Sequence, residues 1–379
     1  MLALVQLLLL SSFAVGQRFP ALWFGTFPSQ GFNSSSFYDL SNYSLVMLGF
    51  TYPDAHNEAT LLANAVAVKK NSGAVPPLVY VYRNAHLALS SFDLQREALA
   101  TLPSSAWLRN CSGAGPCRPG PGDSQAYNYS TSAAAEWYVA KVVEEAAREA
   151  AIDGVFFDEV DWATCGFLQS ECGARFTAAE VESLWVGTAA TMARALARLS
   201  SANKATVQSL FSALASNGRA IDSKPCVHPE EAWLRVMMGD GGGAPPPLLS
   251  RFYGDLGWYG PDGANASVCA AYIRNMLQEA ELGLGQVVRA VLPGPTATEA
   301  DVESLAAAAL LSLTPRSYIG FSTGWGYDDW RWWNVMGREL GAPLGPAEAL
   351  PSGRAWTRDF ARVLARYDCD TRQGSLIWH

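Results

Sequence analysis

The stretch Gly154-Val-Phe-Phe-Asp-Glu159 decides how this chain folds. Its three consecutive apolar residues follow a turn, and such a continuous run is typical of a strand that is covered on both faces. Acidic residues end the run, and Asp161 follows two positions beyond Glu159. Because side chains alternate along a strand, Asp158 lies on the same side as Phe156, and Glu159 either starts on the opposite side or leaves the strand with the loop. The sequence therefore predicts a buried strand with carboxylates at its C-terminal end.

Seven more short apolar or aromatic runs occur outward from this one, with helical patterns between most of them. The eight predicted strands are residues 22–27, 45–51, 78–83, 154–159, 205–211, 248–253, 287–292 and 317–323. Thr177 with Glu180 forms a capping box that begins one helix, and Thr298 with Asp301 begins another. Eight strands that alternate with helices predict a (β/α)8 barrel, and a doubly wound open sheet is the alternative.

Two of the connections are too long for one helix, and we expect both to carry loops inserted on the active face. The connection before Gly154 contains a predicted helix over 132–151 and an extra strand near 127–129. The connection before residue 248 has only a poor helix over 230–238. Neither an internal repeat nor a linker is visible, so these segments are predicted to belong to the same domain as the strands.

The group of acids after Phe157 has the composition that a glycosidase requires. Three carboxyls within four positions repel one another, and a crowded or buried carboxyl has a raised pKa. A glycosidase uses one ionised carboxylate and one protonated carboxyl that gives its proton to the leaving oxygen. In a (β/α)8 barrel the catalytic groups lie at the C-terminal ends of the strands. The alternatives are that these acids cap a helix, bind Ca²⁺ or face solvent.

The run Asp153-Gly-Val-Phe-Phe-Asp-Glu159 resembles a strand of secreted barrel glycoside hydrolases. It is similar to the glycosyl-hydrolase-like families and, more distantly, to the polygalactosaminidase family. Further segments that share the likeness are Leu78-Val-Tyr-Val-Tyr-Arg83, Trp107-Leu-Arg109, Tyr127-Asn-Tyr129, Glu136-Trp137, Trp333-Asn334, residues 340–345 and residues 356–360. The resemblance implies a barrel glycosidase with Asp158 as the leading catalytic carboxylate, and it does not fix the second one.

Several carboxylates are candidates for the partner of the leading one. Asp255 ranks first, because it follows the sixth predicted strand and so lies at the barrel mouth. Glu159 ranks second, because adjacent side chains on a strand diverge. Asp328 and Asp329 follow the eighth strand and Asp54 follows the second, so they stay open as well. A retaining or inverting outcome depends on the separation of the two carboxyls, which the sequence does not give.

Aromatic residues crowd the segment 324–333, which comes directly after the last predicted strand. Sugar rings stack on flat aromatic rings, so we expect Trp325 to face a saccharide and at least two of the other tryptophans to anchor the C-terminal segment. The predicted substrate-binding residues are Tyr82, Arg83, Asp161, Trp162, Trp325 and Asp328. Arg83 could hold a substrate carboxylate or hydroxyl, or it could pair with Asp158.

Composition and motifs exclude several other classes of function. The 27 Lys and Arg are scattered against 35 Asp and Glu, and the net charge of −8 argues against nucleic acid as a partner. The four His lie far apart, so a His-built metal site is not expected, and no cofactor is predicted. Gly320-Phe-Ser-Thr-Gly324 matches the elbow of serine hydrolases, but a helix and a suitable later Asp and His are missing from the pattern.

Residues 1–16 read as a secretory signal peptide, which is too short to span a bilayer. The candidate N-glycosylation sites are Asn33, Asn42, Asn110, Asn128 and Asn265. The candidate disulfides are Cys111 with Cys117 and Cys165 with Cys172. Among the remaining Cys226, Cys269 and Cys369, at least one thiol is expected to be free or to bridge two chains.

Together these features predict a secreted glycoside hydrolase that cleaves a poly- or oligosaccharide by carboxylate acid/base catalysis without a cofactor. Its domain is expected to be a single barrel over 17–379, with a C-terminal extension over 324–379 packed on it. One alternative is a catalytically inactive barrel that binds carbohydrate at the cell surface or wall. Another is a metal-dependent hydrolase that uses Asp158, Glu159 and Asp161. The sequence does not indicate an oligomeric state.

Overall fold

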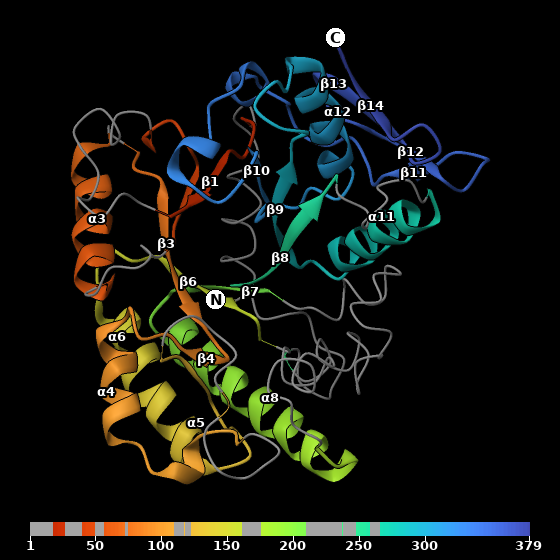
Figure 1. The fold of residues 1–379 in the computed structure, drawn as a ribbon. Coiled ribbons are helices and arrows are strands. Elements are labelled where there is room, and N and C mark those ends of the chain that lie inside the picture. The colour runs from red at the N-terminus through yellow and green to blue at the C-terminus, as the bar shows by residue number, and fades with distance from the viewer. Residues whose placement is uncertain are drawn as a thin grey trace, which may run out of the picture.

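The structure is a computed structural model. It describes residues 18–26, 40–49, 57–72, 75–109, 117, 123–160, 176–209, 237, 248–257 and 266–379, without the side chains of Asp255 and Tyr327. Eight parallel strands form the central sheet in the order β1-β2-β3-β6-β7-β8-β9-β10 (Figure 1). These strands are β1 (Leu22–Gly25), β2 (Leu45–Leu48), β3 (Leu78–Asn84), β6 (Gly154–Asp158), β7 (Ala205–Ser209), β8 (Leu249–Leu256), β9 (Gly285–Val291) and β10 (Tyr318–Ser322).

The first and last strands of this sheet meet, so the sheet closes into a barrel. Ala21, just before β1, forms a parallel bridge with Ile319 of β10. The Ile319 N–H also donates to the carbonyl oxygen of Pro20 at 2.8 Å. This closure confirms the predicted (β/α)8 barrel, and the alternative of an open doubly wound sheet is wrong. Each of the eight predicted runs overlaps one barrel strand, with ends that differ by a few residues.

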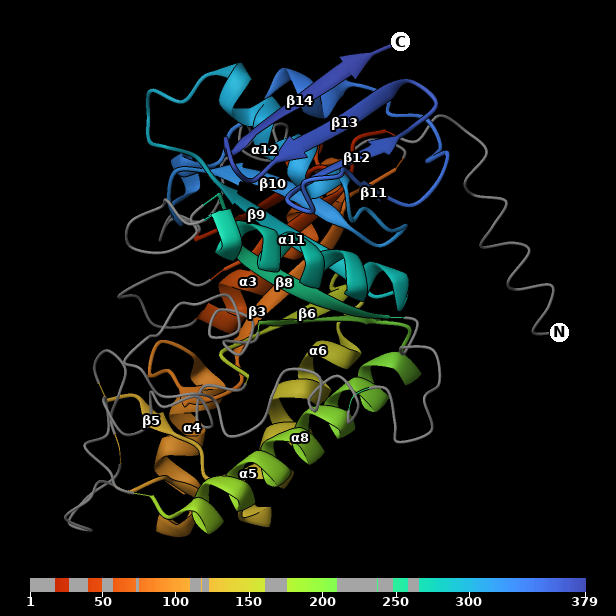
Figure 2. The same ribbon diagram turned by 90° about the vertical axis from the view of Figure 1, so that its right-hand side faces the viewer.

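Helices cover the outside of the barrel (Figures 1 and 2). They are α3 (Asn57–Asn71), α5 (Ser132–Tyr138), the π-helical turn η3 (Val139–Val143), α6 (Glu144–Arg148), α8 (Ala178–Ser201), α11 (Ala266–Glu281) and α12 (Glu299–Leu310). Both predicted capping boxes form, because Thr177 and Thr298 each accept the backbone N–H three residues later. Within the described residues, no helix has the length and apolarity that crossing a membrane requires.

The helix predicted over 132–151 forms as the sequence of α5, η3 and α6, and it ends at Arg148. A π turn inserts an extra residue and rotates the face that follows it. Val142 and Ala146 are buried, whereas Ala150 lies beyond the helix end and is exposed.

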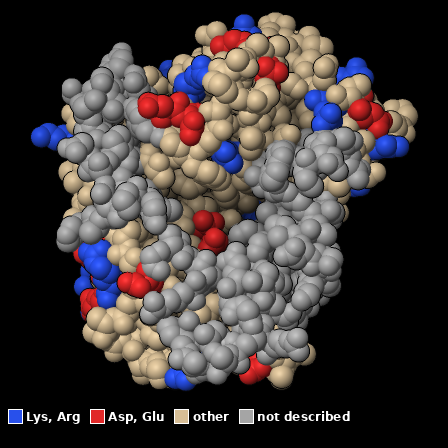
Figure 3. Space-filling view, viewed as in Figure 1, with Lys and Arg blue, Asp and Glu red and all other residues tan. Residues whose placement is uncertain are grey.

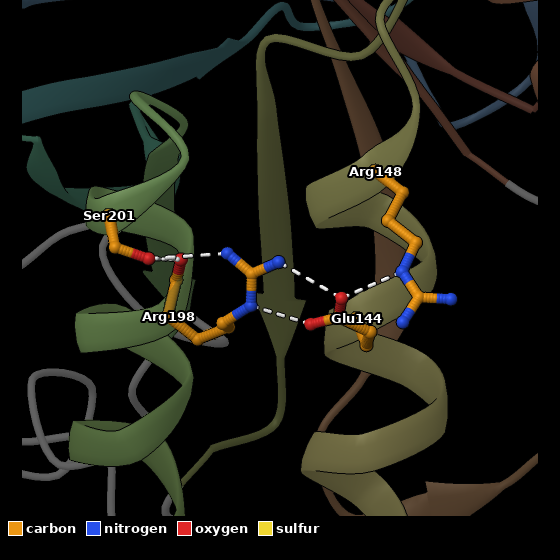
Figure 4. Close-up of polar contacts among 4 residues, drawn as sticks. All are labelled: Glu144, Arg148, Arg198 and Ser201. Atoms are coloured by element: carbon orange, nitrogen blue, oxygen red, sulfur yellow. Dashed lines mark hydrogen bonds and ion pairs between the residues drawn. The ribbon is translucent and has the colours of Figure 1, made fainter.

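An ion-pair cluster joins α6 to α8 on the outer side of the barrel (Figure 4). Arg198 donates from Nε and Nη2 to the two carboxylate oxygens of Glu144, at 2.5 and 3.0 Å. Arg148 adds a third contact, from its Nε to Glu144 Oε1 at 2.7 Å. These hydrogen bonds lower the pKa of Glu144 to about 2, so its carboxylate stays charged at neutral pH.

A two-stranded antiparallel excursion lies between β3 and α5. Its elements are β4 (Leu87–Ala88), α4 (Asp93–Thr101), the 3-10 turn η2 (Ser104–Ala106) and β5 (Gln125–Ala126), with β4 paired to β5. The extra strand predicted near 127–129 is therefore present, slightly earlier in the chain. Tyr127 stacks between Trp107, at 5.2 Å, and Tyr129, at 5.5 Å between ring centroids, which anchors the excursion to the helices.

The C-terminal segment forms a four-stranded antiparallel sheet that the sequence analysis missed. After the 3-10 turns η5 (Tyr327–Asp329) and η6 (Asn334–Gly337), the strands are β11 (Glu348–Ala349), β12 (Ala355–Asp359), β13 (Val363–Asp368) and β14 (Gln373–Trp378). Figure 2 shows this sheet beside α12. Arg358 donates to the carbonyl oxygens of Leu310, Leu311 and Leu313 at the end of α12. A disulfide between Cys269 and Cys369 also ties α11 to this sheet.

Candidate active site

Aromatic side chains fill the barrel just beneath the C-terminal ends of its strands. Phe24, Phe156 and Phe252, from β1, β6 and β8, have ring centroids 4.8 to 5.7 Å apart. Tyr82 of β3 pairs with Phe156 in the strand register, and its ring lies 5.8 Å from that of Phe156. Two residues further along the same strands, Asn84 pairs with Asp158. The side chains of these two residues thus lie directly above an apolar floor.

Asp158 accepts hydrogen bonds from a side chain of β3 and from the backbone that follows β6. The Tyr82 hydroxyl donates to Oδ2 at 3.2 Å, and the Glu159 N–H donates to Oδ1 at 3.0 Å. The Ser209 side chain of β7 also lies beside this carboxyl. Burial raises the pKa of Asp158, and these hydrogen bonds partly oppose the rise because they favour the ionised form. The half-buried carboxyl thus keeps a proton to a higher pH than an ordinary Asp does.

Glu159 has a backbone conformation that is rare for a residue with a side chain. Its φ of 55° lies in the left-handed region, which costs about 1–3 kcal/mol and persists where the surroundings hold it. Asn84 donates from Nδ2 to Glu159 Oε2 at 2.9 Å, which turns the Glu159 carboxylate toward β3. The adjacent Asp158 and Glu159 are therefore part of one hydrogen-bonded cluster, although side chains that alternate along a regular strand would diverge.

Asn84 is a member of this cluster that the sequence analysis missed. The predicted strand ended at Arg83, whereas β3 continues to Asn84. The buried side chain donates to the Tyr82 hydroxyl at 3.1 Å as well as to Glu159. A polar residue that ends a continuous apolar run was the available signal.

Arg83 lies on the helix side of β3, away from the carboxyl cluster. Its Nη2 forms an ion pair with Glu145 Oε2 at 2.7 Å, and its Nη1 donates to the Tyr82 carbonyl oxygen at 2.9 Å. The guanidinium also lies 5.4 Å from the centre of the Phe92 ring. The structure therefore pairs this buried cation with Glu145 and not with Asp158.

Trp325 lies on the opposite side of the barrel mouth from β3, above β1 and β8. Its side chain is 45% exposed, and its ring meets Phe24 edge-on at 5.4 Å. The guanidinium of Arg289, from β9, lies 3.8 Å from the centre of the same ring. Arg289 is itself buried and donates to Ser322 Oγ at 2.8 Å and to the Gly254 carbonyl oxygen at 3.1 Å. Arg289 was not predicted from the sequence.

The other residues after β10 divide between exposed and packed positions. Asp328 is exposed, whereas the Asp329 carboxylate accepts the Gly326 N–H at 2.7 Å and so stabilises the turn. Trp330 and Trp333 are buried. Ser322 is also fully buried, and it accepts a hydrogen bond from Arg289, which does not fit a serine nucleophile.

Several predicted residues lie outside the described part of the chain. Asp255 is placed by its backbone alone, near the C-terminal end of β8, where the register with β9 shifts after Tyr253. Predicted site residues outside the described ranges are Asp54, Asp161 and Trp162. The predicted signal peptide, Cys111, Cys165, Cys172, Asn33, Asn110 and Asn265 also lie outside them. Cys117 is disulfide-bonded, Asn42 is exposed and Asn128 is half-buried.

The space-filling view shows a hollow near the middle of the face of Figure 1, with acidic side chains inside it (Figure 3). In the part of the chain that is described, no three His, Cys, Asp or Glu side chains gather closely enough to hold a metal ion. The cluster can instead bind, orient and exchange protons through two carboxyls, a phenol and an amide.

The fold and this cluster define a (β/α)8 barrel with a carboxylate site at its strand ends. No protein-family model matches the chain, and no curated protein sequence matches it. Among solved structures, Ega3 of Aspergillus fumigatus with galactosamine is similar at 11% identity and a TM-score of 0.41, over 84% of this chain and 94% of that one. The alpha-N-acetylgalactosaminidase NagBb of Bifidobacterium bifidum is similar at 12% identity and a TM-score of 0.43, over 97% of this chain and 58% of that one.

A GH31 alpha-xylosidase of Xanthomonas citri is similar at 8% identity and a TM-score of 0.48. This similarity covers 84% of the present chain and 34% of the xylosidase. These structural neighbours are glycoside hydrolases, but the similarities are too loose to assign an activity to this chain.

Proposed function

We propose that this protein is a glycoside hydrolase that cleaves a poly- or oligosaccharide, with the Asp158 carboxyl as its general acid. The observation that carries the proposal is the placement of Asp158 at the end of the fourth barrel strand, half-buried above an aromatic floor. Burial raises the pKa of this carboxyl, while the Tyr82 hydroxyl orients it. A carboxyl that keeps its proton to a higher pH than an ordinary Asp does can give it to the oxygen that leaves a glycosidic bond.

The second carboxylate has two candidates, which act in different ways. Glu159 belongs to the same cluster, and its carboxylate accepts a hydrogen bond from Asn84 at 2.9 Å. Asp255 is one residue before the end of β8 and is a candidate because the C-terminal ends of barrel strands meet at the mouth. Carboxyls about 5 Å apart lead to retention of configuration, and carboxyls about 6.5–9.5 Å apart leave room for a water and lead to inversion.

Trp325 supplies the platform on which a sugar ring would stack. Its exposed indole stands beside the mouth, and Arg289 covers part of the ring. Exposed aromatic rings that border a hollow with carboxylates are typical of saccharide sites. Tyr82 and Asp328 would contribute further contacts, together with Asp161 and Trp162. Arg83 is left out of the proposal, because its guanidinium is bound on the helix side of β3.

We further propose that the protein is secreted. The apolar segment 1–16, the glycosylation triplets and the disulfide between Cys269 and Cys369 support an oxidising compartment. Treatment of the protein from its natural host with an N-glycosidase would shift its mass if the exposed Asn42 carries a glycan.

The proposal is tested by incubating the protein with a panel of poly- and oligosaccharides and measuring released reducing ends. At least one glycan should be cleaved, and Asp158→Asn should lower kcat by about 10²–10⁴-fold. Asp370→Asn is the matched control, because Asp370 forms an exposed ion pair with Arg354 on the C-terminal sheet. Full activity in Asp158→Asn would refute the role of the carboxyl. Glycan binding without any turnover would instead indicate a carbohydrate-binding barrel.

A further inference from the structure

The orientation of the Asn84 side-chain amide is fixed by its own backbone. Asn84 Oδ1 accepts the N–H groups of His86 and Leu87, at 2.8 and 2.6 Å. Because an amide oxygen cannot donate, this end must face the two N–H groups, and the NH₂ end must face the barrel mouth. The backbone around Asn84 is also held in place. Tyr138 donates to the Asn84 carbonyl oxygen at 3.1 Å, and the Ala85 N–H donates to the carbonyl oxygen of Asp158 at 2.9 Å.

The two protons of that NH₂ group go to different acceptors. Nδ2 lies 2.9 Å from Glu159 Oε2 and 3.1 Å from the Tyr82 hydroxyl oxygen. The Tyr82 hydroxyl keeps its proton, because burial raises its pKa well above the ordinary value. Since the Tyr82 oxygen accepts from Asn84, its single proton is directed to Asp158 Oδ2. The direction of donation is therefore set along the whole chain, from Asn84 through Tyr82 to Asp158.

We propose that Asn84 is the positioning residue of this site: it fixes which atoms of Tyr82 and Glu159 donate and accept, and so divides the proton-donor and carboxylate roles between Asp158 and Glu159. Asn84 acts through these neighbours and needs no contact with substrate. The catalytic part of this assignment depends on the proposed function, whereas the effect on the two carboxyls does not. The left-handed backbone of Glu159 fits the assignment, since Asn84 holds the carboxylate that this conformation presents.

Among the described residues, the groups that face Asp158 are Tyr82 from β3, Glu159, which follows β6, and Ser209 from β7. His86 follows Asn84 and is buried, and burial lowers its pKa to about 3, so it is neutral at neutral pH. A change at Asn84 thus reaches Asp158 through Tyr82 and Glu159.

The test is Asn84→Asp, which keeps the shape of the side chain and the acceptor for His86 and Leu87 but removes both donated protons. The Tyr82 hydroxyl then donates to the new carboxylate, and Asp158 loses that hydrogen bond. The pKa of Asp158 should rise by about one unit or more, measured by NMR on protein with ¹³C-labelled Asp carboxyls and assigned with Asp158→Asn. For a cleaved glycan, kcat should fall by about 10²-fold while KM changes little.

Two further variants make the outcome clear. Asn57→Asp is the matched control, because Asn57 is also buried and donates from Nδ2 to the Ser91 carbonyl oxygen at 2.9 Å, away from the acids. It should leave both quantities unchanged. The double variant Asn84→Asp with Glu159→Gln keeps the net charge and restores a donor between these two positions, so it should fold even where the single variant does not. The pKa of Asp158 should still be raised in it.

An unchanged pKa of Asp158 in the folded single or double variant would overturn the assignment. A raised pKa in a protein that cleaves no glycan would keep the positioning role and refute the proposed function. A raised pKa with kcat unaffected in Asn84→Asp would overturn the catalytic part of the assignment alone.

Discussion

Replacing Tyr82 by Phe removes one hydroxyl from the site and leaves its ring in place. The hydroxyl donates to Asp158 Oδ2 at 3.2 Å, and a hydrogen bond to a charged group contributes about 1.5–3 kcal/mol. Because 3.2 Å is long for this kind of bond, the lower end of that range applies, and about 1.5 kcal/mol corresponds to about one pKa unit. The bond favours the ionised carboxylate, so its loss should raise the pKa of Asp158 by about one unit.

The assay is the pH dependence of kcat/KM for a glycan that the protein cleaves. If Asp158 acts as the protonated acid, its basic limb should move up by about one pH unit in Tyr82→Phe, and the acidic limb should stay in place. Tyr253→Phe is the control, because Tyr253 lies on the helix side of β8, where its ring packs against Tyr272 of α11, away from Asp158. A basic limb that stays fixed or moves down in Tyr82→Phe would refute the reasoning.

Three further predictions concern the stability of the fold. Asp158→Asn should raise Tm at pH 7, because burial raises the pKa of Asp158 and its ionisation then favours the unfolded state. This gain in Tm should vanish below pH 3.8, the ordinary pKa of Asp. A lower Tm at pH 7 would contradict the prediction. Glu144→Gln should lower Tm at pH 7, because the hydrogen bonds from Arg198 hold the pKa of Glu144 at about 2. The difference in Tm between the variant and the wild type should shrink as the pH falls from 4.5 to 2. An equal difference at pH 2 would contradict the prediction. Glu279→Leu should lower the free energy of unfolding, measured in urea, by about 3–5 kcal/mol, because it leaves the charge of Arg251 buried without its partner. Adding Arg251→Met should restore most of the lost free energy of unfolding. A loss under about 1 kcal/mol in Glu279→Leu would contradict the prediction.

The barrel could be predicted because its strands are continuous apolar runs, which few other structures accommodate. The run ending in Asp158 is an example, since Gly154 to Phe157 are all buried. The C-terminal sheet carried a different signal that was overlooked. Along β13, buried Val363, Ala365 and Tyr367 alternate with more exposed residues, which is the period-two pattern of a sheet with one covered face.

Only the site residues that directly follow their own apolar run could be predicted from the sequence. Asp158 follows its own apolar run, whereas the importance of Asn84 depends on its register opposite Asp158 across two strands. Arg289 likewise gains its position from contacts with the residues around Trp325. Which residues of two distant strands lie opposite each other depends on how the whole sheet is paired, and this register cannot be deduced from one sequence.

Trp325 was singled out from the composition of its segment, whereas the Arg289 guanidinium that lies over its ring was not anticipated. The disulfide between Cys269 and Cys369 could not be predicted from the sequence either, because it joins residues that are 100 positions apart.

The central claim is that the Asp158 carboxyl donates a proton to a leaving sugar oxygen. It is tested most directly by comparing kcat/KM of the wild type and Asp158→Asn on two substrates, a cleaved glycan and the matching aryl glycoside, whose leaving group needs no proton. The account predicts a loss of about 10²–10⁴-fold on the glycan and a far smaller loss on the aryl glycoside. Equal losses on both substrates, or no loss on the glycan, would contradict it.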